Sequence, residues 1–142
     1  KSVYANIKEA EVSVNAIKDL VEKTVPAAGF MRGCLYLRKK EGLTLVPLLR
    51  FGDVALERYK TLHYSGSDPV SDSLFSSVPI KWRGNGITGE MATIVAGGFD
   101  DGERTGVLYL ELDPAFEERS DYDAITHFNA IKKAVVDCLS GT

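Results

Sequence analysis

The chain has 142 residues, of which 44% are apolar and 26% are charged, and its formal net charge is -3. This size and composition fit one globular domain that buries enough surface to fold without a metal or a disulfide framework. Its longest basic cluster is Arg38-Lys39-Lys40, and no apolar run approaches the roughly 20 residues of a membrane span. We therefore predict no nucleic-acid partner and no membrane partner.

The first predicted element is a helix over residues 2–24, ended by Pro26. Its apolar residues recur at alternating steps of four and three, a period of about 3.5 that is typical of a coiled-coil or helix-pair seam. Two interpretations stay open: an amphipathic helix that lies on the chain's own sheet, and a dimer helix that continues a signalling helix upstream. The candidate dimer seam consists of Val3, Ile7, Ala10, Val14, Ile17 and Val21.

Two strands are predicted next, over residues 30–39 and 43–51, with a hairpin turn at residues 40–42. Asp53 can cap a short helix over residues 54–62, and Pro69 stands at the start of another over residues 70–76. These two helices would cover one face of the sheet. Further strands are predicted over residues 78–82 and 91–96. Residues 84–89 between them match the dinucleotide pattern GxGxxG, but a strand rather than a helix follows, so we interpret them as a hairpin loop.

The remaining elements are a turn over residues 97–102, a strand over residues 104–112 ended by Pro114, and a long amphipathic helix over residues 120–139 that begins at Ser120. Segments 33–37 and 106–110 share one pattern: Gly, a small apolar residue, then Leu-Tyr-Leu. This echo predicts two paired central strands of one antiparallel sheet. The two long terminal helices would then lie side by side on the face opposite the short helices.

The sequence offers little that indicates catalysis. It has no GxSxG pattern, its histidines are His63 and His127, and no cluster has zinc-ligand spacing. Cys34 and Cys138 are far apart without a CxxC pattern, which favours buried, reduced thiols in a cytoplasmic protein. We therefore predict that the chain is not an enzyme, that it binds no metal, and that no cofactor can be assigned.

Binding of a small molecule has better support. Many amphipathic rings fall on the strands and their cover, with two arginines at strand ends, as a pocket with apolar walls and a few polar groups requires. Plain core packing is the alternative for each residue. The candidate ligand-binding residues are Tyr36, Arg50, Phe51, Tyr59, His63, Phe75, Trp82, Arg83 and Tyr109.

In its order of elements the chain resembles a GAF domain over nearly its whole length. The likeness rests on the leading helix, the 33–37 strand with its partner ending Arg50-Phe51-Gly52, the 69–80 segment, the 106–110 strand and the closing helix. The chain also has a fainter resemblance to the GAF segments attached to HDOD modules of bacterial signalling proteins. A PAS domain is the alternative fold. The resemblance implies an α+β fold: an antiparallel sheet of five or six strands, with the terminal helices on one face and a ligand pocket under short helices and loops on the other.

The resemblance also implies a function. Residues 1–142 would form a single sensory domain, excised from a longer protein, that binds an unidentified small molecule. Its terminal helices would form a homodimer and relay the signal to a covalently linked output domain. The chain lacks the family's cyclic-nucleotide signature and a pocket cysteine for a bilin, and its cysteines do not match those of the free methionine-R-sulfoxide reductases of this fold. A dimerisation module without ligand is the first alternative, and a redox enzyme that uses Cys34 is the second.

Overall fold

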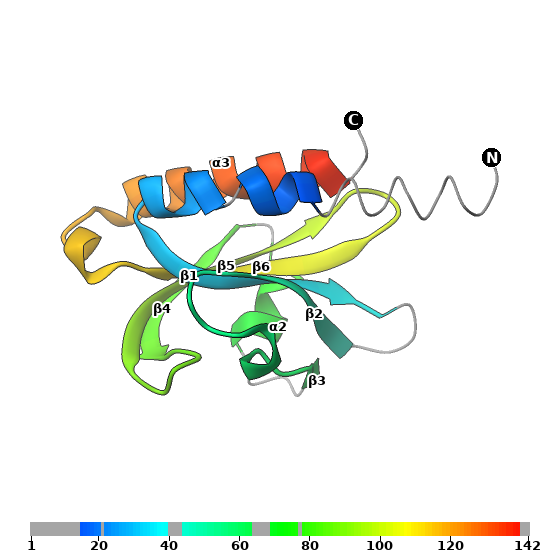
Figure 1. Ribbon diagram of the computed structural model, residues 1–142, viewed down its shortest axis with the longest axis horizontal. Coiled ribbons are helices and arrows are strands. Elements are labelled where there is room, and N and C mark those ends of the chain that lie inside the picture. Colours follow the sequence, from blue (N-terminus) through cyan, green and yellow to red (C-terminus); the bar gives the residue numbers. More distant parts are fainter. Residues whose placement is uncertain (1–14, 21, 40–43, 64–68, 77, 140–142) are drawn as a thin grey trace.

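The computed structural model describes residues 15–20, 22–39, 44–63, 69–76 and 78–139. They form one six-stranded antiparallel sheet in the order β3-β2-β1-β6-β5-β4, with helices on both faces (Figure 1). This confirms the predicted α+β, GAF-like architecture. The elements are β1 (Phe30–Arg38), β2 (Thr44–Phe51), the 3-10 turn η1 (Leu56–Arg58), β3 (Leu62–His63), α2 (Pro69–Ser73), β4 (Ile80–Asn85), β5 (Met91–Asp100), β6 (Thr105–Leu112), the 3-10 turn η2 (Pro114–Phe116) and α3 (Asp121–Leu139).

The two echoing segments are the central strands, as predicted. β1 and β6 pair antiparallel, with Leu35 opposite Leu108. The glycine that opens each segment has a packing reason. A Cβ at Gly33 would strike the backbone oxygen of Tyr109, and a Cβ at Gly106 would strike that of Tyr36. The repeated glycines therefore let the two central strands approach each other closely.

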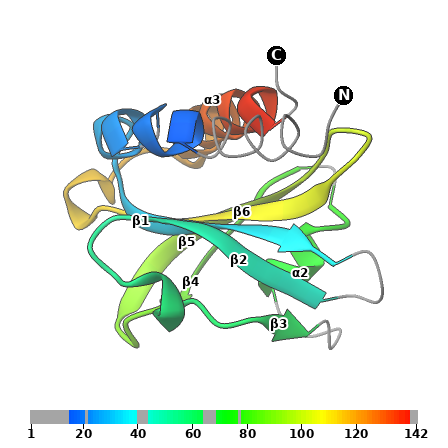
Figure 2. The ribbon, with the colours of Figure 1, turned by 45° about the vertical axis from the view of Figure 1, so that its right-hand side comes forward.

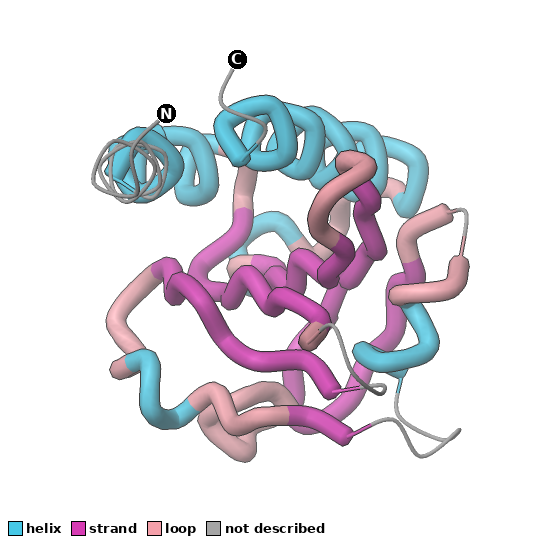
Figure 3. Tube along the Cα trace, turned by 90° about the vertical axis from the view of Figure 1, so that its right-hand side faces the viewer, coloured by secondary structure: helices cyan, strands magenta, loops and turns pink. Residues whose placement is uncertain are grey.

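One face of the sheet carries an apolar core under two helices. The N-terminal helical segment, defined here as residues 15–20 and 22–27, lies beside α3 on this face (Figure 3). Phe30 meets Phe128 of α3 edge-on at 6.5 Å between ring centroids, and Ile17 is buried in the same cluster. The predicted end of the first helix at Pro26 is wrong. The segment continues to residue 27, because a proline in the last turn removes one backbone donor only, and Gly29 at φ 95° follows the helix end.

The other face of the sheet is covered by η1, β3, α2 and the curled hairpin of β4 and β5, and we call it the cover face (Figure 2). The helix predicted over residues 54–62 is wrong. Only the three residues of η1 are helical, because no side chain caps its start, and the chain then extends. Extension buries Tyr59 and lets β3 pair with β2, so tertiary contacts override local helix propensity.

The turn predicted over residues 97–102 is also wrong in its first half, because β5 continues to Asp100. Gly97 and Gly98 serve close packing instead. A Cβ at Gly97 would lie 2.7 Å from the Phe128 ring, and one at Gly98 would lie 2.6 Å from the Ser73 carbonyl oxygen. Successive strand residues face opposite sides, so this glycine pair admits α3 on one face and α2 on the other.

Several shorter predictions are confirmed. Residues 86–90 connect β4 to β5 as a hairpin, closed by the Gly86 N–H to the Glu90 carbonyl at 2.9 Å. Ser120 caps α3, since its hydroxyl accepts from Asp123 N at 3.2 Å. The predicted turn at residues 40–42 lies outside the described part of the chain, and so do residues 64–68, which precede Pro69. No helix within the described residues is long and apolar enough to cross a membrane.

Candidate functional site

The candidate site starts from two neighbouring strands on the cover face. Arg32 and Cys34 of β1 alternate toward this face and stand opposite Glu111 and Tyr109 of β6 in the strand register. A charged residue at an inward position of a central strand needs partners, because an uncompensated buried charge is costly. These partners define the geometry of the site.

Glu111 is completely buried, and three donors from three elements surround its carboxylate. Oε2 accepts the Tyr109 hydroxyl at 2.8 Å and the backbone N–H of Ile87 at 3.1 Å. Oε1 accepts from Nη1 of Arg32 at 3.3 Å, a long contact from a side chain that keeps some exposure. The carboxylate thus joins β1, β6 and the tip of the β4–β5 hairpin.

Tyr59 lies against this carboxylate cluster from the cover. Its ring meets that of Tyr109 edge-on, with centroids 6.3 Å apart and planes at 73°. The residue is only 1% exposed, yet within the described chain its hydroxyl has no hydrogen-bond partner. Burial, and next the charge of Glu111, raise the pKa of this phenol above its ordinary range. An unpaired buried hydroxyl of this kind calls for an explanation.

Cys34 is the thiol of the site, and it is buried as the sequence predicts. Burial raises the pKa of this thiol far above its ordinary value, so it stays protonated at neutral pH. Cys138 is on α3, packed against the helix-side core, so the sheet separates the two cysteines. We call Arg32, Cys34, Tyr59, Tyr109 and Glu111 together the Glu111 site.

Some of the predicted ligand-binding residues come together on the cover face. Tyr36, Tyr59 and Tyr109 share one buried cluster, and Trp82 packs against it. The prediction missed Arg32 and Glu111. The signal was present in Leu110-Glu111-Leu112, where a carboxylate occupies the same face as Tyr109 in a strand otherwise built of apolar residues.

The other predicted residues lie elsewhere. Phe51 belongs to the helix-side core, and Phe75 is 57% exposed beyond α2. His63 meets Thr44 at the edge of the sheet, with 3.3 Å between Nδ1 and Oγ1. Arg50 is exposed and donates to the Gly52 carbonyl. That any of the nine residues binds a ligand stays a prediction.

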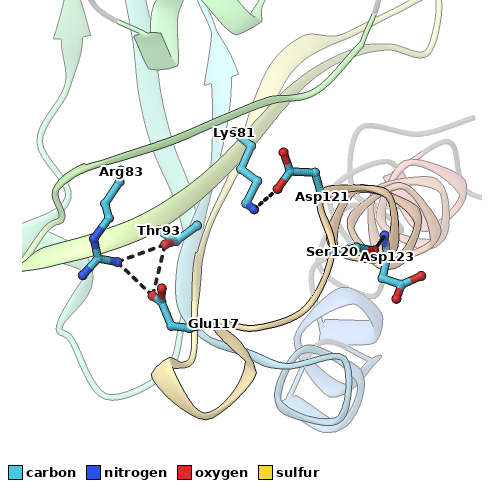
Figure 4. A network of polar contacts seen from close by, with 7 residues as sticks. All are labelled: Lys81, Arg83, Thr93, Glu117, Ser120, Asp121 and Asp123. Atoms are coloured by element: carbon cyan, nitrogen blue, oxygen red, sulfur yellow. Dashed lines mark hydrogen bonds and ion pairs between the residues drawn. The ribbon is translucent and has the colours of Figure 1, made fainter.

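Arg83 belongs to a separate polar network at the sheet edge (Figure 4). Its Nη1 lies 2.9 Å from Oε1 of Glu117 and 3.1 Å from the Thr93 hydroxyl, which also donates to Glu117. Lys81, two residues earlier on β4, pairs with Asp121 at the start of α3. These contacts fasten the base of the β4–β5 hairpin to the connection between η2 and α3.

The candidate dimer seam is described at one position only. Ile17 is completely buried in the chain's own core, which favours the interpretation of a helix that lies on its own sheet, and its part in a dimer seam stays a prediction. The other five seam residues lie outside the described part of the chain. An apolar groove of about 310 Å³ instead runs between the N-terminal helical segment and α3. It is lined by Leu20, Thr24, Ala27, Ala28, His127, Ala130, Ile131 and Ala134.

Comparison with known proteins places the fold but not a family. No protein-family model and no curated protein matches the chain. Among solved structures it is similar to free methionine-R-sulfoxide reductase from Neisseria meningitidis, determined in complex with its substrate. The TM-score is 0.65 at 15% sequence identity, over 91% of this chain and 78% of that one. The chain therefore has the GAF-like fold of that reductase, and the likeness to HDOD-associated segments finds no support.

The same comparison corrects the prediction that the chain is not an enzyme. One solved structure that is similar to this chain over 91% of its length is that of an enzyme. This fold is therefore compatible with catalysis, and a missing sequence motif was not a sound reason to exclude it.

Proposed function

We propose that the protein binds a polar small molecule at the Glu111 site, on the cover face of its GAF-like sheet. The observation that carries this proposal is the buried Tyr59 hydroxyl, which has no hydrogen-bond partner among the described residues, beside a buried carboxylate. A site built to hydrogen-bond a ligand keeps such a group ready, although the free protein is less stable for it. Tyr36, Tyr109 and Trp82 supply aromatic walls around it.

The chemistry of the site favours a ligand that combines charged and apolar parts. A cationic group is stabilised near the Glu111 carboxylate, and an acceptor group can accept a hydrogen bond from the Tyr59 hydroxyl. An apolar chain can pack against the aromatic rings. A free amino acid with an oxidised side chain has all three features. The substrate of the structurally similar reductase belongs to this class, which supports the choice of probe.

Binding can be tested with free methionine-R-sulfoxide and methionine as probes, by calorimetry and thermal stabilisation. We expect the sulfoxide to stabilise the wild-type protein and the Tyr59→Phe variant to bind it at least tenfold more weakly, because one hydrogen bond in a buried site is lost. Tyr122→Phe is the matched control, since Tyr122 is 79% exposed on α3. Equal affinity in wild type and Tyr59→Phe would reject the site.

Reduction of free methionine-R-sulfoxide at Cys34 is a second candidate function. Two observations favour it: Cys34 lies in the Glu111 site, and the similar structure is that of a sulfoxide reductase. Because Cys138 lies across the sheet, a dithiol such as dithiothreitol must supply the second sulfur. The dithiol is oxidised to its disulfide, and the sulfoxide oxygen leaves as water. Methionine formation that persists in Cys34→Ser would reject this candidate.

We propose further that the domain forms a homodimer through the groove beside α3, within a longer cytoplasmic signalling protein whose output domain receives the signal. The exposed apolar lining of this groove supports the proposal. Ala130→Glu places a charge in the groove and should give monomers in sedimentation experiments. Asn129→Glu, one residue earlier and outside the groove lining, should leave dimers intact. A wild-type protein that stays monomeric at high concentration would reject the dimer.

A further inference from the structure

The tip of the β4–β5 hairpin contacts the buried carboxylate of Glu111 directly. The hairpin curls from the edge of the sheet across the cover face (Figure 2). At its tip the Ile87 N–H donates to Oε2 of Glu111 at 3.1 Å. A Cβ added at Gly86 would lie 2.6 Å from Oε1, so the backbone of the tip rests directly on the carboxylate. The tip therefore closes one side of the Glu111 site.

Among the described residues the other hydrogen bonds within residues 86–90 are internal to the tip, and the side chain of Ile87 packs against the buried cluster of the cover face. Gly86 N donates to the Glu90 carbonyl at 2.9 Å, and Gly89 N donates to the Gly86 carbonyl at 3.0 Å. Residues 88–91 are exposed. β4 is the edge strand of the described sheet, so within that sheet no further strand pairs with the hairpin on its outer side.

Side-chain contacts join the base of the hairpin to neighbouring elements. Lys81 pairs with Asp121, and Arg83 is held by Thr93 and Glu117 (Figure 4). Between this clamped base and the tip stands Gly84, where an added Cβ would meet nothing closer than 3.4 Å. A clamped base, a glycine pivot and a tip with its own turn make up a hinged flap.

We propose that residues 85–91 form a lid over the Glu111 site, latched closed by the hydrogen bond from the Ile87 amide to Glu111. A ligand group that donates to Glu111 competes with this amide, so binding and lid opening are coupled. The coupling rests on the proposed function. The latch itself does not, and it can be tested without any ligand.

The first test is amide hydrogen exchange on the wild-type protein, followed by NMR. We expect the Ile87 amide to exchange at least tenfold faster than the Leu108 and Leu110 amides of β6, with little dependence on low urea concentrations. Local opening exposes little surface, whereas global unfolding exposes much. Exchange of Ile87 with the same rate and urea dependence as the β6 amides would overturn the lid.

Variants then test the latch. Glu111→Gln should speed exchange at Ile87 at least tenfold and leave the Gly86 amide, which bonds within the tip, at its wild-type rate. If that variant does not fold, Gly86→Ala displaces the tip and leaves the carboxylate in place, with Thr88→Ala, a change at an exposed residue of the same tip, as matched control. Unchanged exchange at Ile87 in Gly86→Ala would overturn the latch.

The outcomes separate the two proposals. Fast local exchange at Ile87 together with no binding of methionine sulfoxide or methionine would reject the proposed function and support the lid. Binding that depends on the Tyr59 hydroxyl, with Ile87 exchanging only through global unfolding, would reject the lid and support the ligand site.

Discussion

Tyr59 and Tyr109 are two neighbouring buried phenols that differ in one respect. The Tyr109 hydroxyl donates to the Glu111 carboxylate at 2.8 Å, whereas the Tyr59 hydroxyl has no partner within the described chain. Burying a hydroxyl without a partner costs about 1–3 kcal/mol, and a hydrogen bond to a charged group contributes about 1.5–3 kcal/mol. Replacement of tyrosine by phenylalanine should therefore have opposite effects on the free energy of unfolding at these two positions.

We expect Tyr59→Phe to raise the free energy of unfolding by about 1 kcal/mol, since it removes only an unpaired polar atom. Tyr109→Phe should lower it by about 2 kcal/mol, because it leaves Glu111 short of one donor. Urea unfolding of the ligand-free proteins measures both. A loss of stability in Tyr59→Phe as large as that in Tyr109→Phe would mean that the Tyr59 hydroxyl has a partner.

At this scale the sequence could predict that Tyr36, Tyr59 and Tyr109 are inside, because aromatic residues on strands and their cover pack in cores. It could not show that Phe51 faces the helices instead, since that depends on its register opposite Gly33. Nor could it show that Arg83 pairs with Glu117, because 34 residues separate these partners and ion pairs leave no local pattern.

Two ion-pair networks hold the β4–β5 hairpin, and they differ in exposure. At the tip, Glu111 is completely buried, whereas in the pair at the base Arg83 is 54% and Glu117 is 36% exposed. Exposed pairs contribute little, because water and salt screen them, whereas removing one partner of a buried pair leaves the others uncompensated. The stability of the protein should therefore depend far more on the Glu111 carboxylate at the tip than on the Glu117 carboxylate at the base.

We predict that Glu111→Gln lowers the free energy of unfolding by about 3 kcal/mol. The donors that surround the carboxylate would then meet an amide, which has one acceptor oxygen in place of two and no negative charge. Glu117→Gln should cost less than about 1 kcal/mol. Chemical denaturation at low and at 0.5 M salt measures both and should show salt sensitivity in the base pair only. Equal costs for the two variants would contradict the assignment of Glu111 as the central polar group.

Elements with a strong periodic signal were predictable, and those set by packing were not. The repeated glycine-led segments predicted the central β1–β6 pair, and the capping serine predicted the start of α3. The sequence predicts a turn at positions 97 and 98, whereas the structure has strand β5 there, because glycine marks both turns and close approaches. Only the neighbouring α2 and α3, which approach on opposite faces, distinguish these two cases.

Across the whole molecule the sheet separates two unlike cores. The helix side is filled by Leu, Val, Ile and Phe, whereas the cover side also buries groups that can lose a proton, among them Cys34, Tyr59 and Tyr109. Burial is the largest cause of the raised pKa of each, and for Tyr59 and Tyr109 the charge of Glu111 comes next. In the folded protein all three stay protonated well above the pH at which the unfolded chain ionises.

This asymmetry predicts a protein that is sensitive to alkali. Below about pH 8 the three groups are protonated in both states and the contribution to stability is constant. Above the unfolded pKa, about 8.5 for Cys and 10 for Tyr, the unfolded chain releases protons that the folded chain retains. Each group then lowers the free energy of unfolding by about 1.4 kcal/mol per pH unit, which sums to roughly 4 kcal/mol between pH 8 and pH 10.5.

Urea unfolding in the presence of a phosphine reductant, repeated across this pH range, checks the prediction. Because Cys34 ionises first in the unfolded chain, it should supply more than half of the loss. Cys34→Ala should therefore start from a lower stability at pH 8 and yet lose less than half as much as wild type by pH 10.5. A wild-type stability that stays level, or an unchanged loss in Cys34→Ala, would show that the cover face admits water to these groups in the folded protein.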